Sequence, residues 1–149
     1  MKAMKLWSSI LVMCVAMIAL ASCSSESNDG DWAPMKWKAE VNVHKTNGTY
    51  NVAAAGETII FSCRNYSGFW FTGTTVDGEA IYPSNTDETD HLLIDNDYLH
   101  AEIHDNKMTV AFKANNSSQA RNITIGVTAG DIFYTFRFRQ YAHGSVEIP

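Results

Sequence analysis

ITIGVTAGDIFYTFRFRQY, residues 123–141, is the stretch of sequence that decides the fold. Over 123–127 apolar residues alternate with polar or small ones, and this period of two is typical of a half-buried β-strand. Ala129-Gly130-Asp131 indicates a turn, after which apolar residues alternate again over 132–138. The stretch therefore predicts an antiparallel hairpin with one face in a core and the other in water.

The same period of two continues through most of the chain from residue 37. It predicts further strands over 41–43, 49–52, 57–64, 69–76, 99–104 and 108–112. Turn signals such as Asn47-Gly48 and Asp77-Gly78 separate them. After residue 23 no stretch longer than a turn has helical apolar spacing. About seven to nine short strands with regular turns predict an all-β, immunoglobulin-like antiparallel β-sandwich over residues 38–149.

The first 23 residues have the pattern of an export signal. Two lysines precede an apolar run over 6–20, and Leu20-Ala21-Ser22-Cys23 follows. A positive start, a short apolar region and small residues are typical of a cleaved signal peptide, and the run is too short and wrongly flanked to span a membrane. The cysteine at this point resembles a bacterial lipobox. That resemblance implies a signal peptide over 1–22, acylation of Cys23, and a lipoprotein anchored in the outer membrane, facing the cell surface.

After cleavage the chain would be acidic. Residues 1–22 contain Lys2 and Lys5 and no acid, so 9 basic and 16 acidic side chains remain, a formal net charge of −7. Nucleic-acid binding requires a basic surface, and anionic lipid attracts basic segments. We therefore expect no nucleic-acid partner, and membrane contact through the lipid anchor only. Residues 23–37 are expected to include a flexible tether, because SSESNDGD (24–31) is polar and acidic.

The cysteines exclude an intramolecular disulfide in the processed chain. Cys14 would leave with the signal and Cys23 would carry the lipid, so Cys63 remains alone. Cys63 ends an alternating strand, so we expect it to be a small buried residue rather than a reactive thiol.

The last strands carry a family resemblance. A strand leads to the Asn-rich turn Asn115-Asn116, then come Arg121, a strand, a Gly turn, and a final strand that ends at Gln140. This order resembles the end of a BACON domain, a family associated with Bacteroidetes and with carbohydrate binding.

Earlier residues extend the resemblance over 41–141. Gly56 and the strand after it, followed by Asn65 and Trp70, are similar to the family's earlier strands, whereas 81–97 stands in place of its second Trp-centred segment. The resemblance implies an immunoglobulin-like sandwich on a surface lipoprotein that binds carbohydrate or mucin. Fold analogy alone does not establish a function.

An aromatic cluster at 65–71, NYSGFWF, holds most of the candidate ligand-binding residues. Sugars stack on exposed aromatic rings while nearby polar groups bind their hydroxyls. The candidates are Tyr66, Phe69, Trp70, Phe71 and Tyr82, the last from the long polar segment 82–97. Side chains alternate along a strand, and a tryptophan on this strand is usually buried in such a fold. We therefore expect Trp70 in the core, with Phe69 and Phe71 facing outward as a platform.

For two further pairs of side chains a structural role is the main expectation and ligand binding is the alternative. Trp32 and Trp37 follow the tether, and we expect them to pin the first strand to the sandwich rather than stack a ligand. Arg137 and Arg139 share the outer face of the last strand, where we expect cross-strand pairing with acids; an anion-binding patch is the alternative.

Metal binding and catalysis are both poorly supported by the sequence. His100, Glu102 and His104 share one strand face and are weak metal candidates, because no further ligand is identifiable. The acidic residues over 87–97 suit calcium but lack the spacing of an EF-hand, and a solvated loop is the simpler interpretation. No nucleophile motif or phosphate-binding loop occurs, and a sandwich of this size rarely builds a two-carboxylate cleft. We expect no cofactor and no enzymatic activity.

These observations favour a binding module for a glycan or glycoprotein such as mucin, using loops near 65–71 and 82–97. The alternative is a structural or interaction subunit that docks on another outer-membrane or surface protein. An exposed flat aromatic beside polar groups would favour a sugar, whereas an unprotected strand edge would favour a protein partner.

Overall fold

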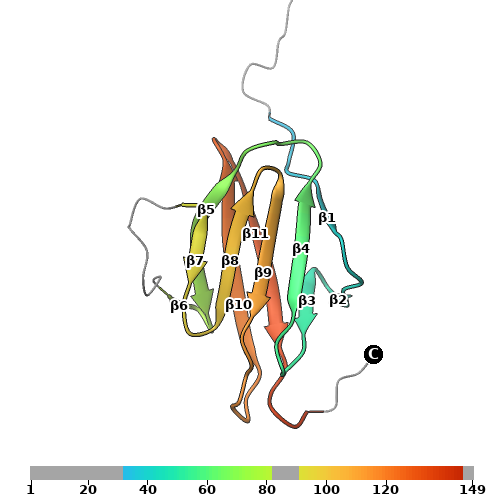
Figure 1. Ribbon diagram of the computed structural model, residues 1–149, viewed down its shortest axis with the longest axis vertical. Coiled ribbons are helices and arrows are strands. Elements are labelled where there is room, and N and C mark those ends of the chain that lie inside the picture. Colours follow the sequence, from blue (N-terminus) through green and yellow to red (C-terminus); the bar gives the residue numbers. More distant parts are fainter. Residues whose placement is uncertain (1–31, 82–90, 146–149) are drawn as a thin grey trace, which may run out of the picture. The chain divides into compact units, whose positions relative to one another are not determined.

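The computed structural model describes residues 32–81 and 91–145, which form two β-sheets (Figure 1). The first sheet has the order β1-β4-β9-β8-β7 and the second has the order β2-β3-β11-β10-β5-β6. The first comprises β1 (Trp37–Ala39), β4 (Thr58–Cys63), β9 (Lys107–Phe112), β8 (Leu99–His104) and β7 (Leu93–Asp95). The second comprises β2 (Lys45–Thr46), β3 (Thr49–Val52), β11 (Ile132–Gln140), β10 (Arg121–Ala129), β5 (Trp70–Val76) and β6 (Glu79–Ala80).

This strand order is that of an immunoglobulin-like sandwich. Strands β1, β4, β9 and β8 occupy the places of strands A, B, E and D, and β11, β10 and β5 occupy those of G, F and C. The pairing is antiparallel throughout except between β3 and β11. The predicted all-β immunoglobulin-like sandwich is therefore confirmed. The described strands number eleven rather than seven to nine, because the short strands β1, β2, β6 and β7 were not expected. The predicted strand over 41–43 is wrong, since these residues are irregular.

The core lies between the two sheets and is rich in aromatic rings. Phe61 on β4 lies 4.7 Å from Phe136 on β11, and Phe112 on β9 lies 4.9 Å from Phe138, measured between ring centroids. Cys63 is also buried, at 1% exposure, as the sequence predicts. The described residues 32–81 and 91–145 thus contain a core of their own, and we expect the chain from residue 24 to fold without the signal segment.

Trp37 on β1 belongs to this core. Its ring lies 4.9 Å from that of Phe69 and 4.8 Å from that of Phe136. The expectation that Trp37 pins the first strand to the sandwich is therefore confirmed. Trp32 is 61% exposed and makes no ring contact within the described residues, so the same expectation is wrong for Trp32.

The strand that carries Trp70 faces the opposite way from the one predicted. Trp70 is 40% exposed, whereas Phe69 and Phe71 are 2% and 5% exposed. The register explains this result, because Phe71 pairs with Val127, whose side chain is fully buried. The expectation of a buried Trp70 and of outward-facing Phe69 and Phe71 is wrong.

A buried polar cluster ties the last strand to two loops. The Gln140 amide donates to the carbonyls of Ala53 (3.1 Å) and Lys113 (2.9 Å). Its oxygen accepts from Arg121 Nε at 2.9 Å. Asn115, 2% exposed, donates from its side-chain amide to the carbonyls of Gln119 and Tyr141, both at 2.9 Å. The Asn, Arg and Gln that carry the family resemblance therefore hold the fold together.

No helix in the part of the chain that the structure describes is long and apolar enough to cross a membrane.

Candidate functional site

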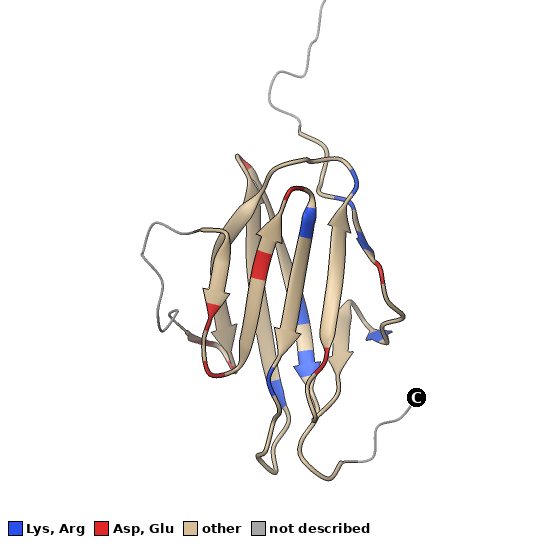
Figure 2. Ribbon diagram, in the orientation of Figure 1, with Lys and Arg blue, Asp and Glu red and all other residues tan. Residues whose placement is uncertain are grey.

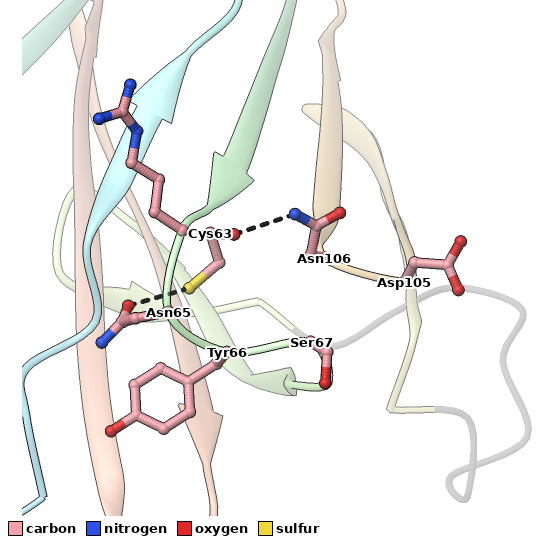
Figure 3. A pocket seen from close by; sticks show the side chains of 7 residues that line it. Cys63, Asn65, Tyr66, Ser67, Asp105 and Asn106 are labelled. Atoms are coloured by element: carbon pink, nitrogen blue, oxygen red, sulfur yellow. Dashed lines mark hydrogen bonds between the residues drawn. The ribbon is translucent and has the colours of Figure 1, made fainter.

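An open pocket of about 430 Å³ lies where the loop between β4 and β5 meets the β8–β9 turn (Figure 3). The lining residues are Cys63, Arg64, Asn65, Tyr66, Ser67, Asp105 and Asn106. The backbone N–H of Cys63 donates to the Asn106 carbonyl at 2.8 Å, and the Asn106 amide donates to the Cys63 carbonyl at 3.0 Å. These two bonds fix the position of one segment against the other, so the floor of the pocket is well defined.

Asn65 and Tyr66 hold the N-terminal segment against this loop. Asn65 Oδ1 accepts from the N–H of Lys36 at 2.8 Å, and Asn65 Nδ2 donates to the Pro34 carbonyl at 3.0 Å. The Tyr66 hydroxyl donates to the Ala33 carbonyl at 2.6 Å. The predicted ligand residue Tyr66 therefore lines the pocket with its half-buried ring, while its hydroxyl already has a partner. The described chain also begins at this end of the sandwich.

Trp70 lies just beyond the loop, on the outer face of the second sheet. It pairs with Thr128 on β10, which in turn pairs with Phe133 on β11. Directly opposite residues in antiparallel strands point to the same side of the sheet. Trp70, Thr128 and Phe133 therefore form a row across three strands, and Phe133 is the most exposed of the three, at 70%.

Phe133 was not among the residues predicted from the sequence. The signal was present, because the alternation that turns Ile132 and Tyr134 toward the core turns Phe133 away from it. Of the predicted candidates, the structure brings Tyr66 and Trp70 to one end of the sandwich, whereas Phe69 and Phe71 belong to the core. Tyr82 lies outside the described residues.

The weak metal candidates do not converge. His100 Nδ1 lies 3.7 Å from Asp95 Oδ2, and His104 Nε2 lies 3.8 Å from Glu102 Oε2. Over residues 32–81 and 91–145, no group of three or more His, Cys, Asp or Glu side chains is arranged to hold a metal ion. Within the predicted set Glu102 therefore pairs with His104, whereas His100 pairs with Asp95 instead.

Asp95, in the described part of the acidic stretch, forms an ion pair with a lysine. Asp95 Oδ1 accepts a hydrogen bond from Lys113 Nζ at 3.1 Å. This hydrogen bond lowers the pKa of Asp95 below its usual value of 3.8. Lys113 also donates to the carbonyl of Asn96, so it closes this loop onto the sheet. The acids at 87, 88 and 90 fall outside the described residues, and the calcium interpretation has no support from Asp95.

The expected ion pairs of Arg137 and Arg139 are not found. Both side chains are exposed on the outer face of β11, where they lie opposite Thr124 and Asn122 of β10. On the other side Arg139 lies opposite Asn51 of β3. Among the described residues no acid forms an ion pair with either arginine. Cross-strand pairing with acids was the wrong expectation here, because the neighbouring strands carry hydroxyls and amides instead.

Comparison with known proteins finds likenesses among solved structures. No family model and no curated protein sequence matches the chain. The chain is similar to a protein from Bacteroides thetaiotaomicron whose structure was determined by NMR, with 30% identity and a TM-score of 0.65, over 83% of this chain and 99% of that one. The M1 domain from titin matches with 11% identity and a TM-score of 0.42, over 77% and 100%.

Proposed function

This chain belongs to the same family as that Bacteroides thetaiotaomicron protein, and from that premise we propose that it is a non-catalytic surface lipoprotein that binds a glycan or a glycoprotein such as mucin. Its anchor would be a lipid on Cys23 in the outer membrane. The finer assignment to the BACON family is part of this proposal. The buried contacts of Asn115, Arg121 and Gln140 support it, since these are the residues that carry the resemblance.

The exposed ring of Trp70 is the observation that carries the proposal. A tryptophan normally contributes a large buried area to a core, so one that is 40% exposed on a regular strand is available for another molecule. Polar side chains of the neighbouring pocket lie at the same end of the sandwich. An exposed flat ring beside hydroxyl, amide and carboxylate groups is the combination that sugar binding requires.

The anchor would attach at this same end of the domain. Tyr66 and Asn65 hold the segment 33–36 against the loop between β4 and β5. Eight residues, 24–31, separate the acylated cysteine from Trp32, and a chain of that length spans at most about 30 Å. A ligand in the pocket would therefore be held close to the membrane, whereas a ligand on the face of a sheet would lie farther from it.

A glycan array that includes mucin O-glycans tests the proposal. The chain from residue 24 would be compared with Trp70→Ala and Tyr66→Phe variants, and Trp32→Ala serves as a control because it also removes an exposed tryptophan. We expect binding that is lost in Trp70→Ala and kept in Trp32→Ala. A well-folded protein that binds no glycan on the array would overturn the proposal.

A second candidate, docking on another surface protein, has its own supporting observation. β11 pairs with β3 only through Phe138–Gln140, so the edge of β11 over 132–137 has no strand partner among the described residues. An open edge of this kind can accept a strand from another protein. A photo-crosslinking residue placed at Thr135, on the intact cell surface, would give a discrete protein adduct if this candidate is correct and none if it is wrong.

A further inference from the structure

We propose that the outer face of β5, β10 and β11 binds an acidic glycan, whose sugar rings stack on aromatic side chains and whose carboxylate or sulfate groups bind arginines. This inference rests on the proposed function and adds to it the class of ligand and the binding surface. Trp70 and Phe133 supply the aromatic end of the surface, and Arg137 and Arg139 supply the cationic end.

The aromatic end is a regular feature of the sheet. Trp70 and Phe133 both pair with Thr128, so two strand spacings separate them, about 10 Å. Thr128 is only 4% exposed, and its hydroxyl lies 2.6 Å from the Gly130 carbonyl and 2.9 Å from that of Ile132. Because the Thr128 hydroxyl is already hydrogen-bonded, it is not offered to a ligand, and the binding groups in this row are the two exposed rings on either side of it. Successive sugars of one chain can contact both rings.

Small side chains occupy the middle of the face, and the Thr72 hydroxyl lies over Gly126, where an added Cβ would be 2.4 Å from it. Gly73 of β5 lies opposite Gly126 of β10, and Gly126 lies opposite Thr135 of β11. In the next row the hydroxyls of Thr75 and Thr124 are 2.7 Å apart. A glycan that lies along the strands would therefore meet no large side chain between the aromatic rings and the arginines.

The cationic end follows on the same strand. Phe133 and Arg137 are four residues apart on β11, about 14 Å at the rise of a strand, and Arg139 continues the row. Arginine binds carboxylates and sulfates through two parallel N–H bonds, and no acid among the described residues forms an ion pair with either guanidinium. Asn51 and Asn122 flank Arg139 and can bind sugar hydroxyls.

The distribution of charge between the two sheets favours an anionic partner at this face. Near the first sheet two acids pair with lysines, Glu40 with Lys107 at 3.3 Å and Asp95 with Lys113 at 3.1 Å. On the second sheet β3, β5, β10 and β11 contain no acid at all, and Figure 2 shows the basic positions near the end of β11. The nearest acids, Asp77, Glu79 and Asp131, lie in turns or on the edge strand β6. Salt screens charges beyond about 8 Å, so the arginines act locally although the chain is acidic overall.

A sugar fits this face better than a protein does. Protein interfaces need about 800 Å² from each partner around a continuous apolar centre. Here the two rings are separated by Thr128 and followed by threonines, glycines and arginines, so no such centre exists on the described part of the face. Isolated rings with hydroxyl, amide and guanidinium groups between them suit a chain of sugars.

The test measures binding of the chain from residue 24 to three polysaccharides by calorimetry. Dextran is neutral, hyaluronan carries carboxylates, and chondroitin sulfate carries carboxylates and sulfates. Two variants probe the face, Trp70→Ala and the double variant Arg137→Gln/Arg139→Gln. Two controls match them, Trp32→Ala for the tryptophan and Lys36→Gln/Lys38→Gln for the loss of two positive charges elsewhere.

We expect binding to hyaluronan or chondroitin sulfate, at least tenfold tighter than to dextran. Each face variant should weaken it at least tenfold, and the arginine variant should also reduce its dependence on salt concentration, because fewer ionic contacts remain. The controls should stay within twofold. Equal binding to dextran would overturn this inference and leave the proposed function standing, whereas binding to none of these polysaccharides, together with an empty glycan array, would overturn both. Equal loss in the controls, or capture of a protein at this face without affinity for acidic glycans, would also overturn the inference.

Discussion

Replacing Gln140 with Leu should destabilise the domain by about 2–4 kcal/mol. Gln140 is fully buried and makes three hydrogen bonds, as donor to Ala53 and Lys113 and as acceptor from Arg121. Leucine preserves most of the volume, so the cavity left behind is small. The loss comes from three broken hydrogen bonds. The Lys113 carbonyl is left without a partner among the described residues, which costs about 1–3 kcal/mol, whereas the Ala53 carbonyl keeps the Gly56 N–H and the Arg121 guanidinium keeps the Ala114 carbonyl, so each of those bonds costs about 1 kcal/mol. The greater apolar burial of leucine offsets part of this loss.

Urea unfolding of the chain from residue 24, followed by circular dichroism, measures this loss directly. For a domain of this size the same loss lowers the melting temperature by roughly 15 °C. Gln119→Leu is the matched control, because Gln119 is exposed and its side chain makes no hydrogen bond within the described residues, so its free energy of unfolding should stay within about 0.5 kcal/mol. A loss below about 1 kcal/mol in Gln140→Leu would refute the claim that these contacts hold the last strand in place.

Three further predictions concern stability and pH. Gly56→Ala should cost at least about 2 kcal/mol in urea unfolding, because Gly56 has a φ of 83° and an added Cβ would lie 2.2 Å from the Phe112 carbonyl oxygen; wild-type stability would contradict this. Thr74→Val should raise the free energy of unfolding by about 1 kcal/mol, because the buried Thr74 hydroxyl has no partner in the described part of the chain; a loss of stability would show that the hydroxyl is bonded. Lys113→Met should raise the pKa of Asp95 toward 3.8 in an NMR titration. Because a lowered carboxyl pKa stabilises the fold above the unfolded value and that contribution is lost as pH falls, the variant should lose less stability than wild type between about pH 5 and pH 2.

Much of the fold could be predicted from the sequence because burial alternates along its strands. The residues at 123, 125 and 127 are fully buried as the period of two requires, and Cys63 is buried for the same reason. The short strands β2 and β6 could not be predicted, since two residues contain no period. The polar signature at 115, 121 and 140 was visible, but its role was not, because its hydrogen bonds join loops distant in sequence.

The candidate site was partly missed because a single bulge changes which way Trp70 faces. The pairing of β5 with β10 shifts between Gly126 and Val127, and the buried positions on β5 accordingly step from Phe71 to Thr74, three residues instead of two. Without that extra residue, alternation counted back from the buried Val76 would turn Trp70 into the core. A glycine inside a strand is a known sign of a bulge, and Gly73, with a φ of 153°, marks this one. The space between the sheets is filled instead by Trp37 from β1, a strand about thirty residues earlier. Local alternation gives the two faces of a strand, whereas the choice of the buried face depends on register and on which distant ring fills the core.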